Sequence, residues 1–154
     1  MKLYIRQKII SWTDSFSVKD ERGNDVYSVR AKLISLVKQL SVYSGSTEVA
    51  RIQRKLISIL PKFLVFVNDR QVTEIQKRLT FIRDKYHLSG LGWDVCGNIL
   101  EHDYTIKSGG NRIATIHKKW MAWSDTYELD INDSCDPIAA LAVIIAIDCV
   151  TAED

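Results

Sequence analysis

Lysine and arginine residues recur at regular intervals along this chain, and they are the side chains best placed to do chemistry. A step of one basic and one apolar residue starts at positions that are 24, 23, 23 and 41 residues apart: Lys8, Lys32, Lys55, Arg78 and Lys119. Ammonium and guanidinium groups bind phosphates and carboxylates through charge-assisted hydrogen bonds. If the fold gathers these positions, the chain presents a surface for an anionic partner.

The sequence contains no recognisable catalytic set. The histidines His87, His102 and His117 are scattered and lack the spacing of a metal or acid–base motif. His102 precedes Asp103, and we expect His102 to be a polar strand residue that faces solvent. No nucleophile elbow or phosphate-binding loop is present, so the Gly-Leu-Gly run at 90–92 predicts a turn. We therefore expect a protein that is not an enzyme and has no catalytic residue and no cofactor.

The acidic stretch 130–136 is the best candidate for a metal site. Aligned to a calcium-binding EF-hand loop, its sixth position is Cys135, where glycine is required, and its twelfth is Leu141, where glutamate is required. The stretch fails this test, so we expect no metal. It predicts instead a turn that leads into the N-cap of a helix.

Composition describes an ordinary globular chain, with 46% hydrophobic and 26% charged residues and a net charge of +2. So small a net charge does not favour nucleic acid as a partner. Cys96, Cys135 and Cys149 show no CxxC spacing, and we expect three free thiols in a reducing compartment. Basic residues interrupt the apolar N-terminus, unlike a signal peptide. We expect a cytoplasmic protein that can associate peripherally with a membrane.

Four of the five copies of the basic step are followed by an aromatic-x-aliphatic run, and the second copy is followed by Leu40-Ser41-Val42. Examples are Phe16–Val18, Phe63–Val65 and Tyr127–Leu129, whose alternation is typical of half-buried strands. Glycine and asparagine, as in Ser108–Asn111, separate the runs and suit tight hairpin turns. The repeat predicts about twelve short antiparallel strands in a meander, with no strong helix before residue 135.

One convincing helix follows at 137–148. Asp136 suits the N-cap and Pro137 the first helical position, while every residue from Ile138 to Ile147 is apolar. The run is too short for a bilayer, which needs roughly 20 apolar residues. A helix without a polar face must then be buried all round, and we expect it inside a closed antiparallel barrel. Residues 1–154 would form this single, monomeric domain.

Several segments resemble the LURP-one-related (LOR) family of the tubby C-terminal-like superfamily. They are the repeated basic-apolar-apolar-Ser steps, Gly92-Trp93-Asp94, Lys118–Trp120 with Trp123–Tyr127, and the closing run 140–148. The resemblance covers nearly the whole chain and implies a twelve-stranded barrel around a central hydrophobic helix. Tubby-like domains bind phosphoinositide headgroups through basic residues, but no residue of that site can be matched to a position here.

The meander and the repeat together predict a basic rim. Alternate strands run the same way, so the basic steps that close them fall at one end of the barrel. We expect this end to bind anionic phospholipid headgroups, phosphoinositides among them, through Lys32, Arg54, Lys55, Lys77, Arg78, Lys118 and Lys119. Two other interpretations stay open. The lysines can be a by-product of the repeat, and the chain can be a protein-interaction scaffold with no lipid role.

Overall fold

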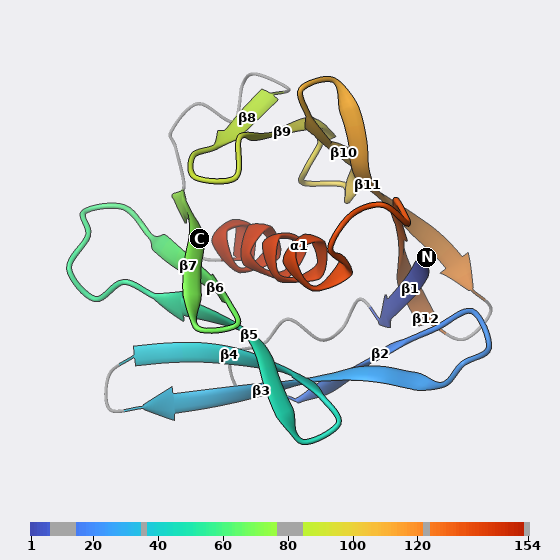
Figure 1. Cartoon of the computed structure of the whole chain (residues 1–154), viewed down its shortest axis with the longest axis horizontal. Coiled ribbons are helices and arrows are strands. Elements are labelled where there is room, and N and C mark those ends of the chain that lie inside the picture. Colours follow the sequence, from blue (N-terminus) through green and yellow to red (C-terminus); the bar gives the residue numbers. More distant parts are fainter. Residues whose placement is uncertain (7–14, 35–36, 77–84, 122–123, 153–154) are drawn as a thin grey trace.

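The computed structural model describes residues 1–6, 15–34, 37–76, 85–121 and 124–152 (Figure 1). Within them, a 12-stranded antiparallel sheet curls around one helix, as the sequence predicts. The strands are β1 (Lys2–Arg6), β2 (Phe16–Lys19), β3 (Asp25–Ile34), β4 (Val37–Ser44), β5 (Thr47–Arg54), β6 (Lys62–Val67), β7 (Arg70–Gln76), β8 (Lys85–Leu88), β9 (Trp93–Asn98), β10 (Asp103–Ser108), β11 (Asn111–Met121) and β12 (Ser124–Ile131); the helix is α1 (Pro137–Ala152).

The sheet is a continuous meander that nearly closes. Consecutive strands pair from β1 to β7 and from β8 to β12, and β1 joins β12 to connect the two halves. Strands β7 and β8 meet at a seam without a backbone ladder among the described residues. Thr73 bridges it by donating its hydroxyl to the Ser89 carbonyl at 2.6 Å. Gly90 is required there, because its φ is +94° and a Cβ would lie 2.5 Å from the Val72 carbonyl oxygen.

Helix α1 occupies the interior of the barrel, as expected. The Asp136 carboxylate accepts a hydrogen bond from the Ile138 amide at 2.9 Å, which caps the first turn. All residues from Ala139 to Val150 are buried, with β5, β6 and β7 against the helix. The helix runs four residues past the predicted end at 148, to Ala152. Among the described residues, no helix is both long enough and apolar enough to cross a bilayer.

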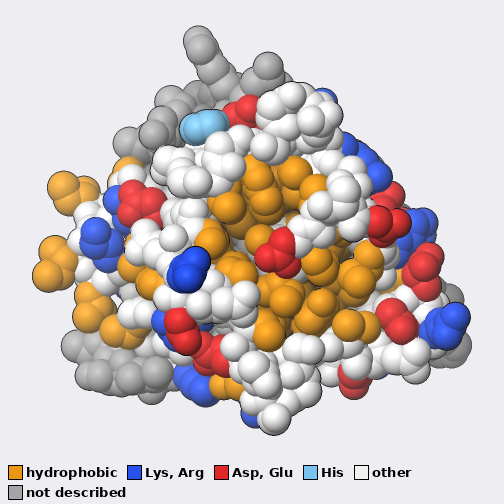
Figure 2. Space-filling view, viewed as in Figure 1, with side chains coloured by type: hydrophobic (Ala, Val, Ile, Leu, Met, Phe, Trp, Pro, Cys, Tyr) orange, Lys and Arg blue, Asp and Glu red, His pale blue; other side chains and the backbone are white. Residues whose placement is uncertain are grey.

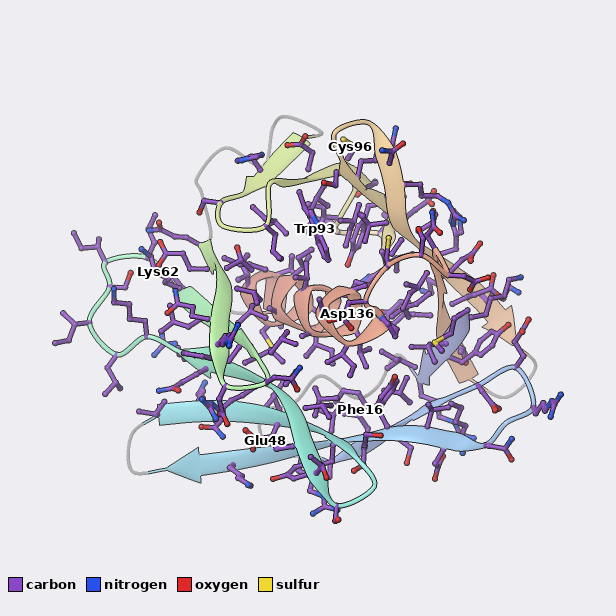
Figure 3. The ribbon with its side chains drawn as sticks, in the orientation of Figure 1. Phe16, Glu48, Lys62, Trp93, Cys96 and Asp136 are labelled. Atoms are coloured by element: carbon purple, nitrogen blue, oxygen red, sulfur yellow. The ribbon has the colours of Figure 1, made fainter. Side chains whose placement is uncertain are left out.

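Alternation along each strand supplies the other half of the core. On β6, Phe63, Val65 and Val67 are buried while the residues between them are half-buried. Figure 3 shows Phe16 of β2 directed toward the helix in the same way. The aromatic-x-aliphatic runs lie on even-numbered strands. Lys32 and Lys119, from the basic steps, lie near the ends of the odd-numbered strands β3 and β11. The third basic step differs, because Lys55–Ser58 lies in the loop after β5 rather than in a strand.

Candidate functional site

The odd-numbered strands of an antiparallel meander all finish at one end of the barrel, which we call the basic end. It carries the predicted residues Lys32, Arg54, Lys55, Lys118 and Lys119, each in the last part of an odd-numbered strand or just beyond it. Lys77 and Arg78 lie outside the described residues, as does Lys8 of the first basic step.

The basic end is not one compact cluster. In Figure 1 the β5–β6 loop projects to the left and the end of the β11–β12 hairpin to the right, with the helix between them. Lysines from these two hairpins therefore lie on different sides of the barrel. A single small ligand could not contact both groups, whereas an extended surface could.

Lys119 is held by an acidic partner on the outer face of β11, β12 and β1. Its ammonium group pairs with the carboxylate of Glu128, which also accepts a hydrogen bond from the Tyr4 hydroxyl at 2.9 Å and lies 3.7 Å from the Lys2 ammonium. Burial alone would raise the pKa of Glu128, but the hydrogen bonds and charges of these partners outweigh it and lower that pKa. Burial and the Glu128 carboxylate raise the pKa of Tyr4 to about 12.

Lys32 and two arginines surround Tyr43 and Phe66 on the outer face of β3–β6. Lys32 donates a hydrogen bond to the Tyr43 hydroxyl at 2.7 Å, and the Arg30 guanidinium lies 4.5 Å from the Tyr43 ring centroid. Arg51 stacks on Phe66 at 4.8 Å and pairs with two carboxylates, from Glu48 at 2.9 Å and Asp69 at 3.2 Å. Sequence reasoning passed over Arg30 and Arg51, which lie on β3 and β5.

The β5–β6 loop combines charge with exposed apolar side chains. Lys55 is exposed, and Lys62, at the base of the loop in Figure 3, pairs with Glu74 at 2.9 Å. Between them, Leu56, Ile57 and Ile59 are 56%, 91% and 103% exposed. Sequence reasoning took this segment for a strand-closing step and missed the exposure. Pro61, which lacks an amide hydrogen for a ladder, is the signal that could have indicated a loop.

His102 does not face solvent as expected, so that prediction is wrong. It lies in the turn before β10 with φ +54°, which aims its ring into the barrel wall. The ring stacks on Tyr127 with centroids 4.2 Å apart, and its Nε2 lies 3.1 Å from the buried Asp148 carboxylate of α1. Burial raises the pKa of Asp148, although the contact with His102 opposes the shift. The neighbouring Asp103 turns away and pairs with His117 at 2.7 Å.

Comparison with known proteins fits this architecture. Residues 1–148 match the model of the LURP-one-related family. The chain belongs to the LURP-one-related family. It is 31% identical over 156 residues to the uncharacterized protein YxjI of Bacillus subtilis (strain 168), covering 100% of this chain and 96% of that protein.

A solved structure supports the same fold. The X-ray structure of a protein from Arabidopsis thaliana superposes with a TM-score of 0.69, covering 97% of this chain and 91% of that one at 16% identity. At that identity the likeness concerns the fold alone, a nearly closed tubby-like barrel with one helix.

This member of the LURP-one-related family has few groups arranged for chemistry in its described part. Two exposed His–Asp pairs, His87–Asp94 and His117–Asp103, each with a 2.7 Å contact, lie on the outside of strands. Within the described ranges, no three His, Cys, Asp or Glu side chains are grouped as metal ligands, and the cysteines are free. Asp136 and Asn132 instead cap the helix and hold the turn before it, as the sequence predicts.

Proposed function

We propose that this protein is a non-enzymatic binding module for anionic phospholipid headgroups, acting as a monomer through the basic end of its barrel. Membership of the LURP-one-related family and the tubby-like barrel support a binding module in general. The observation that carries the lipid proposal is the recurrence of lysines and arginines at or just beyond the ends of odd-numbered strands. The opposite turns mix both signs, with Asp20, Glu21, Asp25, Asp69 and Asp133 beside Lys19, Arg22, Arg70, Lys107 and Arg112.

The predicted residues differ in how well they suit this role. Lys32 and Lys55 are exposed and belong to neighbouring hairpins on one side of the barrel. The ammonium group of Lys119 is already paired with the Glu128 carboxylate, so we assign Lys119 a structural role in the barrel wall. A lysine or arginine near an anionic bilayer contributes about 1 kcal/mol. Several such residues on one side therefore suit a peripheral location on a membrane.

Co-sedimentation with vesicles tests the proposal. We expect the wild type to sediment with phosphatidylcholine vesicles containing phosphatidylserine or a phosphoinositide, and not with phosphatidylcholine alone. Lys32→Glu/Lys55→Glu should weaken this binding at least about tenfold, with an intact, cooperative melting transition as the folding check. The matched control, Arg22→Glu/Lys107→Glu, makes the same charge change in exposed residues at the other end and should bind like the wild type.

The alternative is a protein-interaction scaffold with no lipid role. It would be favoured if the wild type showed no preference for anionic over neutral vesicles at low ionic strength. Equal losses of vesicle binding in the two double variants would also argue against a binding site at the basic end. Such a result would mean that binding depends on the net charge of the protein and not on particular residues.

A further inference from the structure

The β5–β6 loop exposes apolar surface that a folded domain ordinarily buries. Its described residues include Ile57 and Ile59, which are 91% and 103% exposed, and Leu56 at 56%. Figure 2 shows apolar side chains projecting at the left, beside basic ones, where Figure 1 places this loop. Clustered exposed aliphatic residues commonly mark an interaction site, whereas single ones are ordinary.

Local bonds hold the loop in this shape. The Lys55 amide donates to the Lys62 carbonyl at 2.8 Å, which closes the base of the loop. The Ser58 hydroxyl donates to the Leu60 carbonyl at 2.6 Å, and Leu60 and Pro61 are only half-exposed. The loop therefore turns part of its apolar content inward and directs Ile57 and Ile59 outward.

The charges around the loop indicate which kind of partner the exposed aliphatic side chains contact. Arg54 and Lys55 flank one side of the loop and Lys62 the other, where Lys62 pairs with Glu74. We propose that Leu56, Ile57 and Ile59 insert into the interfacial region of an anionic bilayer while Arg54 and Lys55 contact lipid phosphates. This inference rests on the proposed function and adds an apolar, salt-resistant component to it.

The shape and charge of the loop favour a bilayer over a second copy of the chain. A convex tip with separate aliphatic side chains enters a deformable medium more readily than it covers a rigid surface. A symmetric dimer through this loop would also bring the same face of each copy together, with Lys55 near Lys55. An anionic lipid surface carries the complementary charge instead.

The exposed Leu100 provides a matched control. It lies in the β9–β10 loop, also at the basic end, and is 66% exposed. Its neighbours are acidic, because Glu101 and Asp103 follow it in sequence. Ile57→Ser/Ile59→Ser and Leu100→Ser thus remove exposed aliphatic surface from a basic and an acidic setting, and none of the three side chains is needed for the core.

The experiment measures partition onto mixed phosphatidylcholine–phosphatidylserine vesicles at physiological ionic strength. We expect Ile57→Ser/Ile59→Ser to lower the partition coefficient at least about tenfold, and Leu100→Ser to leave it unchanged. Insertion itself is read from an environment-sensitive fluorophore on Ile57→Cys, in a chain with Cys96→Ser and Cys135→Ser, since Cys149 is buried. Its emission should shift to the blue and be quenched by lipid-borne nitroxide, unlike the same label on Glu21→Cys at the opposite end.

The outcomes separate this inference from the proposed function. If the wild type binds anionic vesicles but the serine variants bind equally well and the label at 57 stays in water, insertion is wrong and headgroup binding stands. If the wild type does not bind anionic vesicles at all, the proposed function fails first. If the wild type instead forms dimers that Ile57→Ser/Ile59→Ser dissociates, a second copy is the occupant and the inference is overturned.

Discussion

The β5–β6 and β11–β12 hairpins carry two copies of the same repeated sequence step, yet their lysines lie in different surroundings. Lys119 lies within β11 and is paired with Glu128, whereas Lys55 lies in a loop and is exposed. The sequence difference is the middle residue of the aromatic-x-aliphatic run that follows. That residue is Glu128 on β12 and Leu64 on β6.

The aromatic position of the run differs in the same two hairpins. Phe63 is fully buried on β6, which lies against α1. Tyr127 on β12 instead stacks on His102, which reaches the buried Asp148. The β5–β6 hairpin therefore has a buried phenylalanine and a lysine without a described acidic partner, whereas the β11–β12 hairpin has polar contacts on both faces. A repeated basic step marks where a strand ends, while its cross-strand neighbours decide whether the lysine is available to a ligand.

The largest expected difference is in stability after charge reversal. Lys119→Glu places a second carboxylate beside the mostly buried Glu128. The free energy of unfolding should fall by about 2 kcal/mol, which already allows for the partial exposure of Lys119 to solvent. Lys55→Glu should change it by less than about 0.5 kcal/mol. Urea denaturation of both variants measures the contrast, and equal losses would contradict it.

The stability of the polar contacts inside the barrel on the β11–β12 side should depend on His102. His102→Ala removes the one described partner of the Asp148 carboxylate and should cost about 1–2 kcal/mol at neutral pH. Asp148 has a pKa raised by burial, and losing His102 raises it further. The free energy of unfolding of the variant therefore falls as pH rises from 3.8, the pKa of Asp148 in the unfolded chain, toward the raised pKa of the folded state.

The loss in His102→Ala should therefore shrink when urea denaturation is repeated near that acidic value. Adding Asp148→Asn to His102→Ala removes the buried charge and should recover most of the loss at neutral pH. A loss that is independent of pH would mean that stacking on Tyr127, not the carboxylate, is what His102 contributes.

The ion pair of the β11–β12 hairpin should also show in acid. Because the pKa of folded Glu128 lies below the ordinary glutamate value of 4.5, its stabilising contribution is present above that value and is lost as pH falls through the folded pKa. Glu128→Gln should be about 1 kcal/mol less stable than the wild type at neutral pH. The gap should close in acid, as followed by thermal unfolding across pH; a constant gap would rule out the ion pair as its source.

The smallest expected effect comes from a substitution that makes the β5–β6 hairpin resemble the β11–β12 hairpin. Leu64→Glu places a carboxylate on β6 at the repeat position that Glu128 occupies on β12, near the lysines of the β5–β6 loop. Losing about one effective positive charge should weaken binding to anionic vesicles about fivefold. Leu64 lies opposite Glu74 of β7, so the new carboxylate should also lower the free energy of unfolding by up to about 1 kcal/mol. Leu64→Gln is the isosteric control, and equal binding losses in both would point to lost apolar contact instead.

Much of the fold was predictable because its signals are local. The apolar run after Pro137 and the N-cap at Asp136 define a buried helix, and alternation such as Phe63–Val65 identifies strands and their inward faces. The meander followed from turn residues, and it placed Lys32, Lys55 and Lys119 at one end. The helix end was missed by four residues, because burial continues past Asp148 inside the barrel.

Periodicity and turn chemistry act over a few residues, so they are enough to predict inward-facing strand positions, about twelve strands and the end of the barrel at which the repeated lysines lie. Which of those side chains have partners depends on how distant segments come together in three dimensions. His102 meets Asp148 across 46 positions of sequence because a turn of positive φ points it at α1. Lys119 meets Glu128 through strand register, and Ile57 and Ile59 stay exposed because the β5–β6 loop extends past the sheet. Partnership and exposure depend on three-dimensional neighbours, which a one-dimensional pattern does not specify.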